Sequence, residues 1–183
     1  TMTANGVYAM SAITALTAQN TTGVTGIMDV TPEFLKLELD TVITDIRPDA
    51  VKIGMVSASE LIRVISETIR NYELTNVVVD PVMVATSGGD LTREDIAKAF
   101  NKYLIPLSVL TTPNVSEAEK LADFKINTKE DAIEASKMIK CNNIITGGHL
   151  DGINTINIDG EISIVKQKLI ETDNLHGTGC NLS

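Results

Sequence analysis

Apolar and polar positions follow two alternating rhythms along most of the chain. Short apolar runs recur, and several are apolar on both faces, as buried parallel strands are. These runs are residues 50–56, 76–84, 106–114 and 142–149. Between them, apolar residues recur at helical spacing, as at Leu61, Ile62, Ile65 and Ile69 after the first run. Strands that alternate with helices predict an α/β fold, with a mostly parallel central sheet and helices on both faces.

Pairs of capping residues mark the expected helix starts. Thr31 followed by Pro32 predicts one start, and Pro48 predicts the end of that helix. Ser57 and Glu60 have the spacing of a capping box, which predicts that the Ser57 hydroxyl caps the next helix. The other predicted starts are Thr92 with Asp95 and Thr128 with Asp131.

The two ends of the chain depart from this rhythm. Asp159 and Gly160 stand between two alternating segments and predict a β-hairpin near the C-terminal end. We interpret residues 1–6 as the end of a helix and residues 7–18 as a strand. We expect a single domain over residues 1–183 that is incomplete at both termini, since no clean helix cap opens the chain and no helix follows its closing Gly-Thr-Gly turn.

Composition and charge narrow the classes of function. With 43% hydrophobic and 21% charged residues the chain is an ordinary globular protein. A net charge of −9 without a basic stripe argues against nucleic-acid binding, and no apolar run reaches the ~18 residues of a membrane span. Cys141 and Cys180 suggest neither a disulfide framework nor a metal site, so we expect a reducing cytoplasm.

Polar and glycine-rich residues follow several of the predicted strands at their carboxyl ends. In parallel α/β sheets, ligands bind along this edge. The residues that we expect there are Gln19, Asn20, Gly54, Met55, Asp80, Asn114, Glu117, Gly147, Gly148 and His149.

The closing turn, Gly177–Cys180, has two interpretations. If a helix begins near Thr178, the free N–H groups of Gly177–Cys180 form an anion site. Otherwise the segment is a plain glycine turn. Cys180 is likewise either a small buried side chain or a thiolate stabilised by a helix N-terminus.

The polar residues of the other strand ends also leave alternatives open. Asp80 is either a turn residue or a carboxylate that holds a divalent ion. Asn114 and Glu117 are either a helix cap with an acidic first turn or part of a site. His149 is either a loop residue or a contact to nucleotide phosphate or ribose.

Taken in order, these segments resemble a known family. The segments are YAMSAITALTAQNTTGV, KIGMV, VVVDPVMVATSGG, LTTPNVSEAEKL, TGGHLDG and NLHGTGCNLS. They are similar to the hydroxymethylpyrimidine/phosphomethylpyrimidine kinases of thiamine biosynthesis, which have the ribokinase-like fold. ITALTAQNT and HGTGC are the most specific of the matching stretches, and the likeness runs over the whole chain.

The resemblance implies an ATP- and Mg²⁺-dependent kinase that phosphorylates 4-amino-5-hydroxymethyl-2-methylpyrimidine and then its monophosphate. It implies an anion hole at Gly177, Thr178 and Gly179, with Cys180 as the catalytic base. The implied Mg²⁺ residues are Asp80 and Glu117, the substrate residues are Gln19, Thr17 and Met55, and the nucleotide residues are Asn114, Thr146, Gly148 and His149.

The sequence departs from the family pattern in two ways. Thr146 stands where the family usually has Lys, which predicts weaker nucleotide binding or transition-state stabilisation. The glycine-rich first strand of the family and the helix after the anion hole lie outside residues 1–183. Besides the pyrimidine kinase, a pyridoxal kinase of the same fold and a non-catalytic pyrimidine-binding module remain open. We expect small-molecule partners, no nucleic acid or membrane, and a homodimer.

Overall fold

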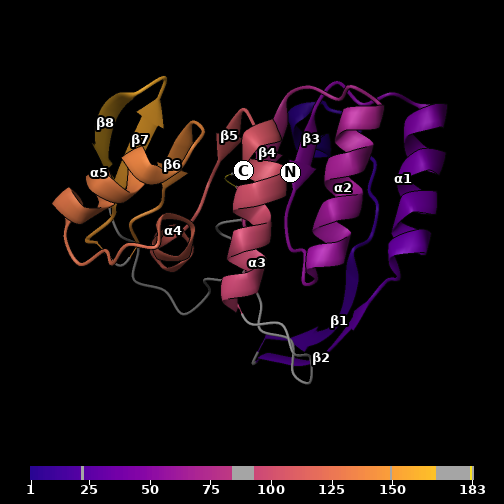
Figure 1. Ribbon diagram of the computed structural model, residues 1–183, viewed down its shortest axis with the longest axis horizontal. Coiled ribbons are helices and arrows are strands. Elements are labelled where there is room, and N and C mark those ends of the chain that lie inside the picture. Colours follow the sequence, from indigo (N-terminus) through magenta and orange to yellow (C-terminus); the bar gives the residue numbers. More distant parts are fainter. Residues whose placement is uncertain (22, 84–92, 149, 168–181, 183) are drawn as a thin grey trace.

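The molecule is built around one open sheet. The computed structural model describes residues 1–21, 23–83, 93–148, 150–167 and 182. In this part of the chain the sheet has the order β3-β4-β5-β6-β7-β8 (Figure 1). Its strands are β3 (Val51–Ile53), β4 (Val77–Val79), β5 (Leu110–Thr111), β6 (Asn143–Ile145), β7 (Ile153–Ile158) and β8 (Glu161–Lys166). The first four are parallel and the last two antiparallel, which confirms the predicted α/β class with a mostly parallel sheet.

Five α-helices of the described residues form a layer against this sheet. They are α1 (Pro32–Asp45), α2 (Ser59–Asn71), α3 (Arg93–Ala99), α4 (Val115–Ala122) and α5 (Lys129–Met138). Each helix contacts the next one along the chain, and Figure 1 shows α2 and α3 side by side. Strands in sequential order with right-handed crossovers place their connecting helices on one face. Helices on the opposite face therefore stay a prediction.

Shorter helical turns flank these elements. Helix α3 continues into a π-helical segment, η2 (Phe100–Leu104), and a 3-10 turn, η3 (Ile105–Leu107). A 3-10 turn, η1 (Thr3–Asn5), ends at Gly6 in the left-handed region. The core between sheet and helices is aliphatic, and its most deeply buried side chains include Val77, Val79, Leu61, Ile62, Phe100 and Leu104. Among the described residues, no helix has the length and apolarity that crossing a membrane requires.

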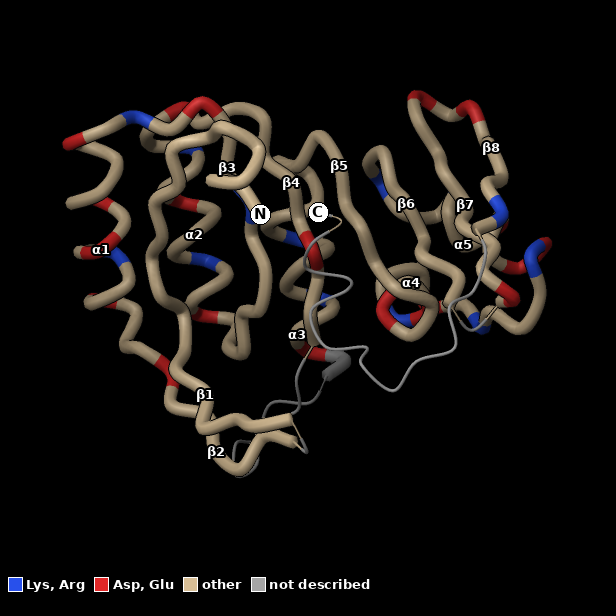
Figure 2. The backbone as a smooth tube through the Cα atoms, turned by 180° about the vertical axis from the view of Figure 1, so that it is seen from behind, with Lys and Arg blue, Asp and Glu red and all other residues tan. Residues whose placement is uncertain are grey.

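A second, two-stranded sheet stands apart from the central one. Strands β1 (Ala15–Asn20) and β2 (Gly23–Asp29) are antiparallel, and both Figures 1 and 2 show this hairpin projecting from the body. The predicted strand over residues 7–18 is wrong in its start, because the pairing with β2 begins only at Ala15. Gln19 and Asn20 consequently lie within β1 rather than after it.

Most of the predicted local signals are confirmed. Thr31 caps α1 by accepting a hydrogen bond from Phe34 N at 3.2 Å, and Thr128 and Asp131 form a capping box at α5. Asp159 and Gly160 both have positive φ, as a two-residue hairpin between β7 and β8 requires. Thr92 lies outside the described residues, and α3 begins directly after it at Arg93.

The capping box predicted at Ser57 and Glu60 is wrong. Ala58 is the N-cap of α2, and no side chain caps this helix. The Ser57 hydroxyl donates instead to the Asp29 carboxylate at the end of β2. The partner of the Ser57 hydroxyl is therefore a distant carboxylate and not a backbone N–H of α2.

Candidate active site

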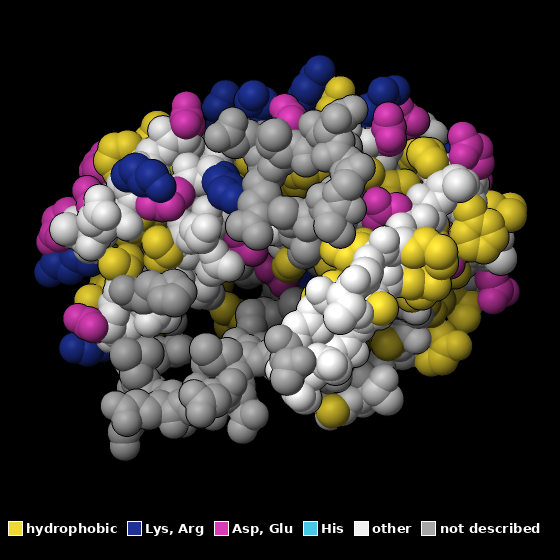
Figure 3. Space-filling view, turned by 90° about the horizontal axis from the view of Figure 1, so that it is seen from below, with side chains coloured by type: hydrophobic (Ala, Val, Ile, Leu, Met, Phe, Trp, Pro, Cys, Tyr) yellow, Lys and Arg dark blue, Asp and Glu magenta, His cyan; other side chains and the backbone are white. Residues whose placement is uncertain are grey.

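Four parallel strands bring the predicted site residues to one edge of the sheet. The backbone ladder continues past the strand ends, since Asp80 N donates to Ile53 O at 2.8 Å and Thr146 N to Pro113 O at 2.9 Å. An isolated parallel bridge joins Asn114 to Thr146. The predicted convergence of residues from separate strand ends is thus present for Asp80, Asn114 and Thr146. Figure 3 looks onto this edge and shows acidic side chains near its middle.

Asp80 is the most buried acidic group at this edge. Its side chain is 6% exposed, and Lys52 Nζ lies 3.4 Å from its Oδ2. Lys52 belongs to β3, and its ammonium reaches along the strand toward Gly54. Burial of a carboxylate in this way is tolerable when a charged partner is close.

Glu117 faces the same place from the first turn of α4. It shares a capping box with Asn114, in which Glu117 N donates to Asn114 Oδ1 at 3.0 Å and Asn114 N donates to Glu117 Oε2 at 2.9 Å. The pKa of Glu117 is raised to about 7, mainly by burial and also by the negative charge of Asp80, while hydrogen bonds from the backbone of Asn114 and Met83 act to lower it. The helix-cap interpretation of the Asn114–Glu117 pair is confirmed, and its place in a site stays a prediction.

The two carboxylates of Asp80 and Glu117 fit a magnesium site, which needs few protein ligands, better than a metal site built entirely from protein side chains. Within the described ranges, no group of three or more His, Cys, Asp or Glu side chains is placed to hold a metal. Mg²⁺ is commonly held by one or two carboxylates together with water and substrate phosphates. The raised pKa of Glu117 also fits, since an arriving cation would favour the ionised form.

The turn after β6 depends on a glycine. A Cβ atom at Gly147 would lie 1.6 Å from Ile153 O, so no other residue fits without moving the backbone. Gly147 N donates to Asn154 Oδ1 at 2.9 Å, which fixes the turn against β7. The next residue, Gly148, is exposed and has open space around its Cα. Gly147 is therefore structural, and Gly148 is free to face a ligand.

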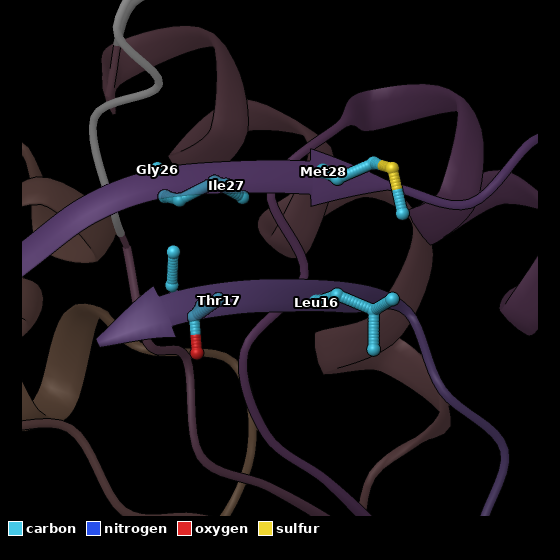
Figure 4. Close-up of a pocket in the computed structure, with 6 residues that line it drawn as sticks. Leu16, Thr17, Gly26, Ile27 and Met28 are labelled. Atoms are coloured by element: carbon cyan, nitrogen blue, oxygen red, sulfur yellow. The ribbon is translucent and has the colours of Figure 1, made fainter. Parts of the chain in front are cut away.

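The β1–β2 hairpin carries two of the predicted substrate residues. Thr17 and Gln19 are exposed, and Thr17 Oγ1 lies 3.4 Å from Gln19 Oε1. An open hollow of about 420 Å³ lies on the hairpin (Figure 4). Its lining residues are Leu16, Thr17, Ala18, Gly26, Ile27 and Met28. Of the predicted substrate residues, Thr17 lines this hollow, whereas Gln19 and Met55 do not.

Met55 lies in the loop between β3 and α2. It is partly buried, and its carbonyl oxygen accepts a hydrogen bond from Thr14 Oγ1 at 2.7 Å. Thr14 directly precedes β1. The hairpin and the predicted pocket wall are therefore joined.

The remaining predicted residues lie outside the described part of the chain. They are His149, Gly177, Thr178, Gly179 and Cys180. Conversely, Lys52, the charged partner of Asp80, was missed by the sequence analysis. A lysine inside an otherwise apolar strand is the feature of the sequence that could have indicated a buried acidic partner.

Comparisons with known proteins agree on one family. The phosphomethylpyrimidine kinase family model matches residues 1–183. A hydroxymethylpyrimidine/phosphomethylpyrimidine kinase of Bacillus subtilis is 40% identical over 97% of this chain and 68% of that protein.

Two solved structures have the same fold. The phosphomethylpyrimidine kinase of Clostridium difficile has a TM-score of 0.79 at 38% identity, over 91% of this chain and 74% of that one. A Bacillus subtilis pyridoxal kinase, solved as an ADP complex, has a TM-score of 0.85 at 30% identity, over 95% and 69% of the two chains. The family model, the sequence identity to its members and the shared fold together show that this chain belongs to the phosphomethylpyrimidine kinase family.

Proposed function

We propose that this kinase transfers phosphoryl groups from ATP to 4-amino-5-hydroxymethyl-2-methylpyrimidine and then to its monophosphate. The observation that carries the proposal is the meeting of Asp80, Asn114 and Glu117 at the carboxyl edge of the sheet, in a chain of this family. Phosphoryl transfer needs aligned reactants and neutralised charge more than covalent help from the protein. An edge with one buried carboxylate, one partly buried carboxylate and exposed glycine backbone is suited to that task.

Asp80 and Glu117 are the residues that would hold Mg²⁺, which when bound would supply positive charge to the phosphates. Lys52 fixes the Asp80 carboxylate from the protein side. Asn114, Thr146, Gly148 and His149 would face the nucleotide, and the open space at Gly148 supports a close approach. We propose Gly177, Thr178 and Gly179 as the anion hole and Cys180 as the base on the family resemblance.

The hairpin supplies the side that would bind the pyrimidine. The Gln19 amide can both donate and accept, as an aminopyrimidine edge requires. Thr17 stands beside it on the same strand, and Met55 would form the opposite wall. A binding site between a hairpin and the body of the domain would exclude water from the transferred group.

A pyridoxal kinase is the second candidate. The TM-score favours it, at 0.85 for the Bacillus subtilis pyridoxal kinase against 0.79 for the Clostridium difficile enzyme. Sequence identity favours the pyrimidine kinase, at 38% against 30%. We weight identity more heavily, because substrate choice depends on side chains and TM-score reports only the path of the backbone.

The substrate experiment is a direct competition. The full chain is incubated with ATP, Mg²⁺ and equal amounts of the pyrimidine and pyridoxal, and both phosphorylated products are quantified over time. We expect the pyrimidine monophosphate to form first and the diphosphate to follow. Preferential formation of pyridoxal phosphate would overturn the substrate assignment, and no transfer to either compound would overturn the proposed function.

We also propose a homodimer in the cytoplasm. Leu16, Val24 and Met28 of the hairpin are 53%, 46% and 63% exposed, and apolar side chains gathered in this way favour association. Cys141 is a free thiol, which suits a reducing compartment. Sedimentation equilibrium would test the dimer, and a monomer at micromolar concentration would contradict it.

A further inference from the structure

Both strands of the β1–β2 hairpin are tied at their base to the same short loop. At the start of β1, Thr14 Oγ1 donates to Met55 O at 2.7 Å. At the end of β2, the Asp29 carboxylate accepts from the Ser57 hydroxyl. Val30 N donates to Thr14 O at 3.2 Å and joins the two strands to each other. The loop that receives both ties connects β3 to α2.

Among the described helices and strands, none packs extensively against the hairpin. Its two strands contact chiefly one another, and most of their side chains are exposed. A two-stranded hairpin is only marginally stable without a third strand or a helix packed against it. Its orientation therefore depends on the interactions at its base.

The Ser57 hydroxyl bonds to Asp29 and does not cap helix α2. Ser57 is 2% exposed, and it directly precedes the N-cap of α2, yet α2 has no side-chain cap. A buried hydroxyl proton without an acceptor loses stabilisation, and the Asp29 carboxylate provides that acceptor. The same loop carries Met55, two residues earlier.

We propose that Thr14, Asp29 and Ser57 form a clasp that sets the distance between the hairpin and Met55. They are positioning residues, since they act through Thr17, Gln19 and Met55 rather than on the substrate. The inference rests on the proposed function in one respect, which is that Thr17, Gln19 and Met55 bind the small-molecule substrate. The proposed nucleotide residues Asn114 and Thr146 follow other strands, β5 and β6, so the clasp acts on one substrate and not on the other.

The first test measures the hairpin itself. Hydrogen exchange of residues 15–29 is compared in the full-length protein with Ser57→Ala, Asp29→Ala and the double variant. We expect each single variant to speed exchange of the hairpin amides by about tenfold and the double variant to add little, because both remove one interaction. Unchanged exchange, or fully additive effects, would overturn the clasp.

Two matched variants control this experiment. Asp29→Asn keeps an oxygen that accepts from Ser57 and should restore slow exchange. Ser66→Ala removes another buried serine hydroxyl, which donates to Arg63 O within α2, and should leave the hairpin unchanged. If Ser57→Ala does not fold, Asp29→Ala is used in its place, because Asp29 is exposed and its substitution removes no core packing.

The second test measures catalysis. In Asp29→Ala we expect the KM for the small-molecule substrate to rise about tenfold, while kcat and the KM for ATP change less than about twofold. A purely structural defect would lower kcat, or raise the KM for ATP and the KM for the small-molecule substrate together, and would overturn the positioning role. If the enzyme phosphorylates neither pyrimidine nor pyridoxal, the proposed function fails, and the exchange experiment still decides whether the clasp exists.

Discussion

The sheet edge and the β1–β2 hairpin carry the two halves of the candidate site and are built in opposite ways. At the edge, Asp80 follows a buried strand and is held by the backbone ladder and by Lys52. On the hairpin, Thr17 and Gln19 are exposed, and hydrogen bonds at the base join their strands to the body. The proposed metal-binding carboxylate therefore lies on a firmly bonded edge, and the proposed substrate residues lie on a lightly attached hairpin. Four predictions test this difference.

The largest expected effect is on activity at the rigid edge. In Asp80→Asn the negative charge beside Lys52 is lost, and we expect kcat/KM for phosphoryl transfer to fall about a thousandfold. The matched control is Asp45→Asn, at an exposed position at the end of α1, and this variant should keep wild-type kinetics. An Asp80→Asn enzyme within tenfold of wild type would remove Asp80 from the site.

The second prediction concerns the stability of the edge. Gly147→Ala places a Cβ against Ile153 O, and we expect the free energy of unfolding to fall by about 3 kcal/mol, measured by urea denaturation. Gly148→Ala adds the same methyl group in open space and should cost less than about 1 kcal/mol. Equal losses in the two variants would show that the turn after β6 is not rigid.

The third prediction concerns pH. Because the pKa of Glu117 is raised to about 7, the folded state binds more protons at this residue than the unfolded state does between about pH 4.5 and 7. Stability from this group is therefore present in acid and lost as pH rises through that window. We expect wild type to lose about 2 kcal/mol relative to Glu117→Gln between pH 4.5 and 8.

Glu119 provides the control of opposite sign. A hydrogen bond from Ile126 N lowers the pKa of Glu119, so its contribution is present at neutral pH and lost as pH falls. Relative to wild type, Glu119→Gln should therefore be least stable at neutral pH. Denaturation curves of both variants from pH 4 to 8 would check this, and a Glu117→Gln curve parallel to wild type would contradict a raised pKa.

The smallest expected effect is on the hairpin. Leu16 is 53% exposed, so Leu16→Ala should change the free energy of unfolding by less than about 0.5 kcal/mol. Leu61→Ala in buried α2 should cost about 3 kcal/mol in the same urea titration. A large loss in Leu16→Ala that grows on dilution would instead place Leu16 in the dimer interface.

Local signals in the sequence predicted much of the fold. Thr31, Thr128 and the pair of Asn114 and Glu117 mark helix starts because a cap involves residues only three apart. Asp159 and Gly160 predicted their hairpin for the same reason. The edge of the sheet followed from the alternation of strands and helices, which places residues after successive strands together.

The sequence by itself thus determined the alternation of strands and helices after the first hairpin, the helix caps at Thr31, Asn114 and Thr128, and the edge of the sheet where the strand ends meet. Tertiary structure alone decided that Ser57 bonds to Asp29 instead of capping α2, that Lys52 pairs with Asp80, and that β1 starts at Ala15. In each of the first two pairs the partners are 28 residues apart along the chain. A hydroxyl or an ammonium can donate a hydrogen bond to any acceptor that lies close to it in the folded protein. Which acceptor it meets therefore depends on how separate strands and helices pack, and not on the spacing of residues along the chain.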